Sequence, residues 1–282
     1  MKLIGVLGAG TMGCGIIQVL AQNGFEVVFI EREKTLIDKA ASSIIKNLEK
    51  MVGKGKITED EKIKISGRIK GYTDMSALMS ADIVIEAATE NVEAKKEMFR
   101  QLDKNCEDKT ILATNTSALS ITEIAAVTER PEKVIGMHFF NPVLAMKLVE
   151  VINGLSTSEE TRSSIMELAE ALGKSPVKVE EAPGFVVNRI LIPMINEAVG
   201  ILADGVASAE DIDKAMQLGA NFPMGPLALG DLIGLDVCLA IMETLHREYG
   251  EDKYRPHVFL RKMVRDRKLG RKTGEGFFNY SK

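Results

Sequence analysis

Several features that define other classes of protein are missing from this sequence. It has no Trp, only 5% aromatic residues, and three cysteines, Cys14, Cys106 and Cys238, that form no C-x-x-C pair. These cysteines lie far apart in a chain too long to need disulfide staples, so we expect a reducing, cytoplasmic compartment. With 36 basic and 40 acidic residues the net charge is −4. Nothing in the overall charge therefore favours nucleic acid or an anionic membrane as a partner.

Charged residues are also missing between Lys2 and Glu26, as they are in a signal peptide or a membrane span. The same segment, however, carries six glycines and the polar side chains of Gln18, Gln22 and Asn23. Its glycines follow a phosphate-binding pattern, which argues against export and against membrane insertion. No other stretch is long and apolar enough to span a bilayer, and no internal repeat or low-complexity segment is evident.

The chain does contain enough apolar residues for a large core, since 45% of its 282 residues are hydrophobic, and its length suggests two domains. Short apolar runs bounded by turn residues predict buried strands at Lys2–Leu7, Phe25–Ile30, Ile83–Ala87, Ile111–Ala113, Val134–Met137, Leu148–Ile152 and Val177–Val179. Helical patterns lie between most of them, at Thr11–Asn23, Val92–Lys104, Ser120–Ala126 and Ser158–Leu172. This alternation predicts an α/β domain with a Rossmann-type, doubly wound and mainly parallel sheet.

Two further helical patterns, Lys34–Val52 and Thr58–Ile65, form a pair longer than a simple crossover requires. The second opens with a capping box made by Thr58 and Glu61. A basic turn with Lys50, Lys54 and Lys56 lies where the two helices meet. We interpret the pair, about residues 34–66, as an insertion that reaches over the substrate.

The composition changes after Glu181-Ala182-Pro183-Gly184. From Phe185 onward we find only helical patterns, at Phe185–Ala203, Ser208–Leu218, Pro226–Tyr249 and Pro256–Arg267. The sequence therefore predicts a nucleotide-binding domain over residues 1–183 and a second, all-helical domain over residues 184–282.

The first turn contains a motif of the form G-x-G-x-x-G, Gly8-Ala9-Gly10-Thr11-Met12-Gly13, of which Gly8, Gly10, Thr11, Met12 and Gly13 are the candidate cofactor-binding residues. It follows a predicted strand, opens a predicted helix, and precedes a second strand that ends at Glu31. In this order the glycines admit a pyrophosphate to the helix N-terminus, where free N–H groups and the helix dipole favour an anion. Glu31 would accept hydrogen bonds from the adenosine ribose and repel a 2′-phosphate, which favours NAD over NADP, although Arg32 softens that preference.

Only three histidines are available for acid–base chemistry: His138, His246 and His257. The last two lie in the predicted helical domain, where packing or surface roles are common. His138 follows the predicted strand Val134–Met137, and ligands of a doubly wound sheet bind at such carboxyl ends. Imidazole exchanges protons near neutral pH and suits the oxidation of an alcohol, but a buried core histidine is an equally good interpretation of this residue alone.

The surrounding residues are more specific, because they carry a resemblance to a known family. Five motifs carry it: Asn115-Thr116-Ser117-Ala118-Leu119, Met137-His138-Phe139-Phe140-Asn141-Pro142, Met146–Ile152, Ala182–Arg189 and Leu269–Phe277. With these motifs the sequence resembles the 3-hydroxyacyl-CoA dehydrogenases, and the bacterial short-chain members in particular. The motifs fall in the family's order, and the resemblance covers nearly the whole chain.

The resemblance implies a reaction and a set of catalytic residues. Reversible, NAD-dependent oxidation of a 3-hydroxyacyl-CoA such as 3-hydroxybutyryl-CoA would use His138 as the general base, with Glu150 holding its other ring nitrogen. A charge inside the apolar run Leu148–Ile152 is costly without a partner, which also favours this pairing over a strand cap. Ser117 and Asn188 would hydrogen-bond the substrate oxygens, although alone they would pass for a turn residue and a helix-surface amide.

The same resemblance implies residues around the rest of the cofactor and the substrate. Glu90, Lys95, Asn115 and Asn141 are expected near the nicotinamide half of NAD. The CoA phosphates require a local basic cluster, for which Lys50 and Lys54 are the candidates, with Lys56 behind them. A solvated lysine face is the alternative for these side chains.

Two other functions remain open at this point: a related dehydrogenase acting on a sugar acid, and a non-catalytic protein that binds NAD(H). The second domain contains two apolar helices, Phe185–Ala203 and Pro226–Tyr249. They permit a homodimer interface, as the family resemblance implies, or a hydrophobic core within one subunit. We expect no metal site, no nucleic acid and no membrane partner.

Overall fold

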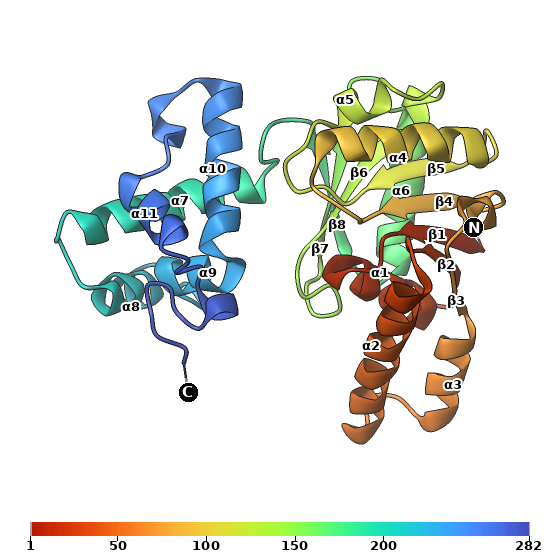
Figure 1. The fold of residues 1–282 in the computed structure, drawn as a ribbon, viewed down its shortest axis with the longest axis horizontal. Helices are drawn as coiled ribbons and strands as arrows, with labels where there is room; N and C mark the ends of the chain where they lie inside the picture. The colour runs from red at the N-terminus through yellow and green to blue at the C-terminus, as the bar shows by residue number, and fades with distance from the viewer. Residues whose placement is uncertain (1, 282) are drawn as a thin grey trace. The chain divides into compact units, whose positions relative to one another are not determined.

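The computed structural model describes residues 2–281. They divide into two compact units, one ending at Ala182 and the other beginning at Pro183. Figure 1 shows the elements of each unit. No helix within the described residues is long and apolar enough to cross a membrane.

The first unit is built on an eight-stranded sheet with the order β3-β2-β1-β4-β5-β6-β7-β8. Neighbouring strands are parallel except for the antiparallel pair β6 and β7. The apolar residues of the central strands β4, β5 and β6 are buried on both faces, as expected for a sheet covered by helices on its two sides. The strands are β1 (Leu3–Leu7), β2 (Glu26–Ile30), β3 (Ile69–Tyr72), β4 (Ile83–Glu86), β5 (Ile111–Thr114), β6 (Val134–Phe139), β7 (Leu148–Asn153) and β8 (Ser175–Glu180).

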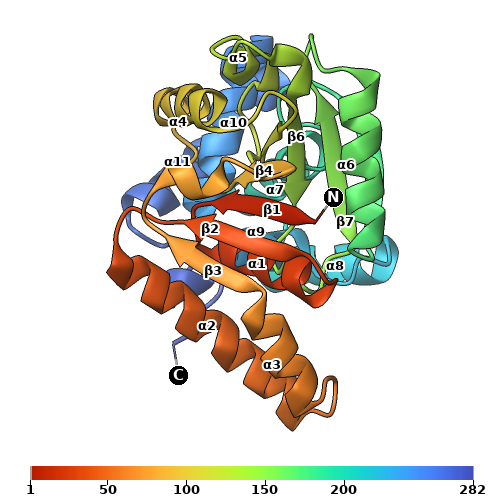
Figure 2. The ribbon, with the colours of Figure 1, turned by 90° about the vertical axis from the view of Figure 1, so that its right-hand side faces the viewer.

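Helices connect these strands and cover the sheet (Figure 2). They are α1 (Thr11–Gln22), α2 (Lys34–Gly53), α3 (Glu59–Gly67), α4 (Val92–Asn105), α5 (Ile121–Ala125) and α6 (Glu159–Ala171), with short 3₁₀ turns η1 (Met75–Leu78) and η2 (Pro131–Lys133). Each α-helix begins within a few residues of its predicted start. β3 was not predicted, because Ile69-Lys70-Gly71-Tyr72 contains a charge and a glycine and has no fully apolar face.

The helical pair α2 and α3 forms a hairpin whose helices lie side by side beyond β3 (Figure 2). Ala40, Ile44 and Leu48 recur every four residues on α2 and are buried against the core of the sheet domain. The predicted capping box of α3 is confirmed. The Thr58 hydroxyl accepts a hydrogen bond from Glu61 N at 3.2 Å, and Glu61 Oε2 accepts one from Thr58 N at 2.7 Å.

The second unit is helical and has its own apolar core. Its elements are α7 (Val187–Ala203), α8 (Ala209–Gly219), α9 (Pro226–Ile233), α10 (Leu235–Tyr249), α11 (Val258–Arg265) and the 3₁₀ turns η3 (Asp252–Tyr254) and η4 (Arg271–Thr273). A Rossmann-type sheet followed by a helical unit is the fold class that the sequence predicts.

Two helix predictions in this unit are wrong. The pattern Pro226–Tyr249 is not one helix, because Gly234 has φ 106° and separates α9 from α10. α7 begins at Val187 rather than Phe185, because Phe185 has a positive φ of 50° that does not fit an α-helix.

Candidate active site

The predicted site residues of the first unit gather at the carboxyl edge of the sheet. β1, β4, β5 and β6 are neighbours and parallel, so their carboxyl ends meet at one edge. The glycine turn follows β1, Glu90 and Lys95 follow β4, and Asn115 and Ser117 follow β5. The sheet order reverses between β1 and β4, which is where open α/β sheets bind their ligands.

The glycine turn leaves no space for side chains at two of its positions. A Cβ on Gly13 would lie 2.0 Å from the carbonyl oxygen of Gly8. Gly8 itself has φ 90°, and a Cβ there would lie 2.5 Å from Ala88 Cα. At Gly10, by contrast, a Cβ would meet nothing within 4 Å, so this position is open to an approaching group. The turn thus packs tightly against the sheet and is open where a pyrophosphate would arrive.

The N-terminus of α1 suits an anion. The helix has no side-chain cap at Gly10 and no acidic residue in its first turn. Its first N–H groups and the helix dipole therefore attract negative charge. At the end of β2, Glu31 Oε1 accepts a hydrogen bond from Ala9 N at 2.6 Å, which holds the carboxylate beside the turn. Thr11 and Met12 lie in the first turn of α1. A dinucleotide fits this arrangement.

His138 and Glu150 lie opposite each other in the antiparallel pair β6 and β7. Nδ1 of His138 is 2.8 Å from Glu150 Oε2. Both side chains are buried, with 6% and 1% exposure, and the imidazole also lies against Phe140 with ring centroids 4.5 Å apart. His138 is a residue of β6, which continues to Phe139, so the prediction that the strand ends before it is wrong by two residues. The pairing gives the buried carboxylate the partner that its charge requires.

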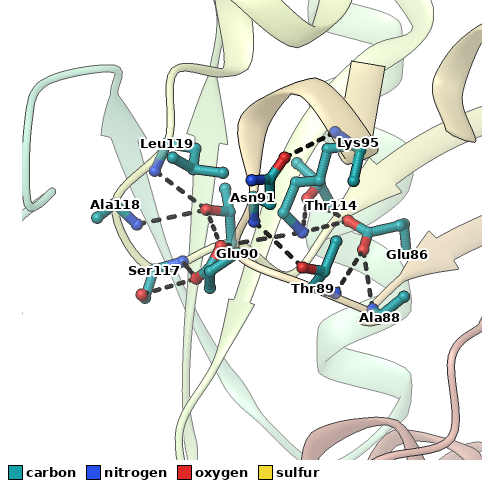
Figure 3. Close-up of polar contacts among 12 residues, drawn as sticks. Glu86, Ala88, Thr89, Glu90, Asn91, Lys95, Thr114, Ser117, Ala118 and Leu119 are labelled. Carbon is teal, nitrogen blue, oxygen red and sulfur yellow. Dashed lines mark hydrogen bonds and ion pairs between the residues drawn. The ribbon is translucent and has the colours of Figure 1, made fainter. Parts of the chain in front are cut away.

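A second polar cluster lies at the ends of β4 and β5, on the loops that follow them and on α4 (Figure 3). Lys95 forms an ion pair with Glu86 and donates to Thr114 Oγ1 at 3.3 Å. Nearby, Glu90 accepts hydrogen bonds from Ser117 N at 2.6 Å and from Ser117 Oγ at 2.8 Å. The structure thereby brings together three predicted residues, Glu90, Lys95 and Ser117, and adds Glu86, which sequence analysis did not identify.

The two predicted asparagines of this unit occupy different positions. Asn115 is buried, and its Oδ1 accepts a hydrogen bond from Phe139 N at 2.8 Å, which fixes the amide next to the end of β6. Asn141 is exposed and lines a cavity of about 460 Å³ together with Gly10, Thr11 and Glu31. The same cavity runs along one side of α2, from Leu36 to Asn47.

A second cavity, also of about 460 Å³, adjoins the first, since Asn47 and Leu144 line both. Its lining includes five lysines and, among the described residues, no acidic side chain. Lys174 is half-buried, and its Nζ donates to the carbonyl oxygen of Met146 at 2.9 Å. Burial lowers the pKa of this lysine. The five lysines are Lys50, Lys54, Lys56, Lys147 and Lys174.

Sequence analysis pointed to Lys50, Lys54 and Lys56 but missed Lys147 and Lys174. These two are distant along the chain, and they become neighbours because β7 and β8 are parallel and Ser175 N donates to the carbonyl oxygen of Lys147 at 2.8 Å. The available signal was that each lysine directly precedes a strand. Five lysines around one cavity form a basic patch on a chain whose net charge is −4.

Asn188 belongs to the second unit, where it lies half-buried in the first turn of α7. The three cysteines are free thiols. No group of three or more histidine, cysteine or carboxylate side chains that would hold a metal ion occurs in residues 2–281.

Comparison with known proteins identifies the family. The model of the 3-hydroxyacyl-CoA dehydrogenase NAD-binding domain matches residues 3–182, and that of the family's C-terminal domain matches residues 184–280. The chain belongs to the 3-hydroxyacyl-CoA dehydrogenase family. It is therefore an NAD-dependent oxidoreductase, and the predicted family and enzyme class are confirmed.

Relatives with a curated name agree with this assignment. A 3-hydroxybutyryl-CoA dehydrogenase from Clostridioides difficile is 57% identical over 282 residues, which cover 100% of both chains. A probable 3-hydroxybutyryl-CoA dehydrogenase from Bacillus subtilis is 53% identical, covering 99% of this chain and 98% of the relative. The crystal structure of (S)-3-hydroxybutyryl-CoA dehydrogenase from Ralstonia eutropha superposes with a TM-score of 0.98 at 49% identity and covers 100% of both chains.

Proposed function

We propose that this protein catalyses the reversible oxidation of (S)-3-hydroxybutyryl-CoA to acetoacetyl-CoA with NAD. The observation that carries the proposal is the buried His138–Glu150 pair at the sheet edge that also holds the glycine turn. The short acyl chain is supported by relatives named 3-hydroxybutyryl-CoA dehydrogenase at 57% and 53% identity over nearly the full chain.

The proton of the substrate hydroxyl goes to His138. Because Nδ1 faces Glu150, we assign the exchange with the C3 hydroxyl to Nε2. The Glu150 carboxylate fixes the tautomer and stabilises the imidazolium formed when the O–H bond breaks. The hydride that leaves C3 is accepted by the nicotinamide ring when NAD⁺ is bound. In the reducing direction His138 returns the proton to the C3 oxygen.

Ser117 and Asn188 are proposed to hydrogen-bond the substrate oxygen that gains negative charge. In the structure the Ser117 hydroxyl donates to Glu90 at 2.8 Å. A hydroxyl has a single hydrogen, so donation to the substrate requires this contact to be exchanged. Glu90, Lys95, Asn115 and Asn141 are proposed to surround the nicotinamide half of the cofactor.

For the adenosine half, NAD is proposed over NADP. The Glu31 carboxylate is held 2.6 Å from Ala9 N beside the turn, where it accepts from ribose hydroxyls and repels a 2′-phosphate. Arg32 is exposed and follows Glu31 in the sequence, and its positive charge attracts a 2′-phosphate. We therefore expect the protein to bind NAD more tightly than NADP, and not to exclude NADP completely.

The phosphate groups of CoA are proposed to bind in the lysine cavity beside the C-terminal part of α2. Lys50 and Lys54 face this second cavity, and Lys147 and Lys174 add positive charge from the β7 and β8 side. The phosphate groups of CoA would be held there by charge-assisted hydrogen bonds. A sugar acid carries one carboxylate and no phosphate, so a cavity with five lysines favours CoA over that alternative.

The test is NADH oxidation with acetoacetyl-CoA by the wild type and His138→Ala, with NADH binding followed by fluorescence. We expect His138→Ala to lower kcat by about 10²–10⁴-fold while NADH binding persists, because a positioned acid–base group contributes that much. Glu150→Gln is expected to lose less, and NADPH to be used less well than NADH.

His246→Ala, which removes a histidine of α10, is the matched control and should keep the wild-type rate. Turnover that survives His138→Ala would exclude the acid–base role. A wild type that binds NADH but does not turn over acetoacetyl-CoA would move the assignment to a sugar-acid dehydrogenase or to a non-catalytic NAD(H)-binding protein.

We also propose that the protein is a homodimer formed through the second unit, and that it works in the cytoplasm. The dimer is supported by large apolar side chains exposed on that unit, among them Ile190 at 68% and Leu218 at 77%. Three unpaired cysteines suit a reducing compartment.

A further inference from the structure

Glu86 is a wholly buried carboxylate that the proposed reaction does not use. It is the last residue of β4, it has 0% exposure, and each of its oxygens has a different set of partners. Oε1 accepts from Ala88 N at 2.8 Å and from Thr89 N at 3.4 Å. Oε2 accepts from Thr114 Oγ1 at 2.9 Å and forms the ion pair with Lys95. A carboxylate this buried and this fully bonded fixes the groups around it.

The first group it fixes is the backbone next to the glycine turn. Ala88 is the residue against which Gly8 packs, since a Cβ on Gly8 would lie 2.5 Å from Ala88 Cα. Through Oε1, Glu86 therefore holds the wall of the pyrophosphate-binding turn. The same oxygen shapes the start of the loop that carries Glu90 (Figure 3).

The second group it fixes is the ammonium of Lys95. Its side chain has 2% exposure, so it cannot exchange its charge partner for water. Its Nζ lies between two carboxylates, bonded to Glu86 and 3.9 Å from Glu90 Oε2. Glu90 is exposed, and it bonds Thr116 and Ser117. Lys95 thus connects the buried carboxylate to the exposed one.

We infer that Glu86 is a positioning residue for the cofactor site, acting through Lys95 on Glu90 and through the Ala88–Thr89 backbone on the glycine turn. The inference rests on the proposed role of Glu90 and Lys95 beside the nicotinamide. Glu86 itself is buried and is not assigned a contact with substrate or cofactor.

A double-mutant cycle on Glu86 and Lys95 tests the inference, with the Kd of NADH measured by fluorescence as the readout. In Glu86→Gln the amide NH₂ faces either Lys95 or the backbone N–H groups, and one set of contacts is lost. We expect the Kd of NADH to rise about tenfold in Glu86→Gln and in Lys95→Met, with a larger rise in the KM for NADH than in the KM for acetoacetyl-CoA.

The effects of Glu86→Gln and Lys95→Met on the free energy of NADH binding should not be additive. In the Lys95→Met background, Glu86→Gln is expected to raise the Kd by less than about threefold more, because the route through the lysine is gone and only the contacts with the Ala88–Thr89 backbone remain to be lost. Glu86→Asp should recover part of the affinity, since the charge returns. If the two rises in Kd multiply fully, the route through Lys95 is overturned, and a Glu86→Gln Kd equal to the wild type would overturn the inference as a whole.

Stability is followed separately by Tm. Glu86→Gln removes the buried counter-charge of Lys95 and leaves only the exposed carboxylate of Glu90 at 3.9 Å, so it should lower Tm, whereas the double variant has no buried charge there and should recover it. A double variant that recovers both Tm and NADH affinity would mean that Glu86 and Lys95 only stabilise the fold and do not position the cofactor site. That outcome would also overturn the inference.

Lys96→Met is the matched control, because this neighbouring lysine of α4 pairs only with the exposed carboxylates of Glu93 and Glu123 among the described residues. It should leave the Kd of NADH unchanged. If the wild type failed to turn over acetoacetyl-CoA, the proposed function would fail. The double-mutant cycle, which is measured by NADH binding, would still decide the role of Glu86.

Discussion

Cys14 is the thiol closest in sequence to the glycine turn, and its surroundings differ from those of the other two. Burial raises the pKa of Cys106 to about 11 and that of Cys238 to about 12. Cys14 is only half-buried, lines the cavity with Gly10 and Thr11, and its Sγ lies 3.0 Å from the carbonyl oxygen of Ala9. Burial and then the charge of Glu31 also raise its pKa.

We predict that a thiol reagent modifies Cys14 before the other two cysteines, and that NADH or acetoacetyl-CoA slows the reaction. The reactive form is the thiolate, and a pKa raised above its ordinary value of 9.0 keeps this form scarce near neutrality. The labelling rate should therefore increase about tenfold per pH unit between about pH 7 and 9. Peptide mass mapping over time gives the order, and Cys14→Ser should remove the fast phase.

The sequence predicted the contact of a single residue correctly where a charged side chain in an apolar strand requires a partner. A carboxylate at Glu150 inside an apolar run pointed to a buried counterpart, and the structure places His138 Nδ1 at 2.8 Å. Glu86 escaped notice because a single acid at the end of a short strand has the same pattern as an ordinary exposed turn residue. Its burial depends on Lys95 and Thr114, which come from α4 and β5, and such contacts follow only from the packing of separate elements.

At the scale of elements, the helix break at Gly234 is the clearest departure from the sequence pattern. The apolar periodicity continues from α9 into α10, so a single helix was the natural prediction. Gly234 has φ 106° and ψ 123°, a conformation that side-chain-bearing residues rarely adopt. A Cβ there would also lie 3.0 Å from Asp236 Oδ1 and 3.1 Å from Lys272 Nζ.

Gly234→Ala is therefore expected to destabilise the protein by about 1–3 kcal/mol, the usual cost of one residue in such a backbone region. The measurement is urea unfolding at fixed protein concentration. Gly219→Ala, at the end of α8, has a negative φ and open space around its Cβ, and should be neutral or stabilising by up to about 1 kcal/mol. Equal stability of Gly234→Ala and the wild type would mean that the break between α9 and α10 is not imposed by the backbone.

Local signals gave the remaining elements with small errors. The Thr58 and Glu61 capping box placed the start of α3 correctly, because a cap acts within four residues of one helix. β3 could not be found in this way. Its strand state depends on parallel pairing with β2, which places Val27 beside Ile69 and supplies the hydrogen bonds that Ile69–Tyr72 alone cannot satisfy.

At the scale of the whole molecule, charge is unevenly arranged. The net charge is −4, yet five lysines surround one cavity of the first unit. Composition alone favoured no polyanionic partner and gave no sign of this cavity, because Lys147 and Lys174 are brought to it by the pairing of β7 with β8. The average charge of a chain therefore says little about a local site, because the proposed substrate site depends on which distant residues the sheet places together.

The proposed dimer also belongs to the scale of the whole molecule, because apolar residues either build the core of a unit or form an interface between subunits. Each unit has its own core, so the exposed apolar side chains of the second unit are not needed to fold it. Ile190 on α7 is 68% exposed, and a charge there should cost little in the monomer but much at a closed, isologous interface.

We predict that Ile190→Glu shifts the protein from dimer to monomer in sedimentation velocity while its far-UV CD is retained. Leu155→Glu, at an 88% exposed position of the first unit, is the matched control and should stay dimeric. A monomeric wild type would exclude the dimer, and a dimeric Ile190→Glu would place the interface on another face of the second unit, where Leu218→Glu is the next variant to measure.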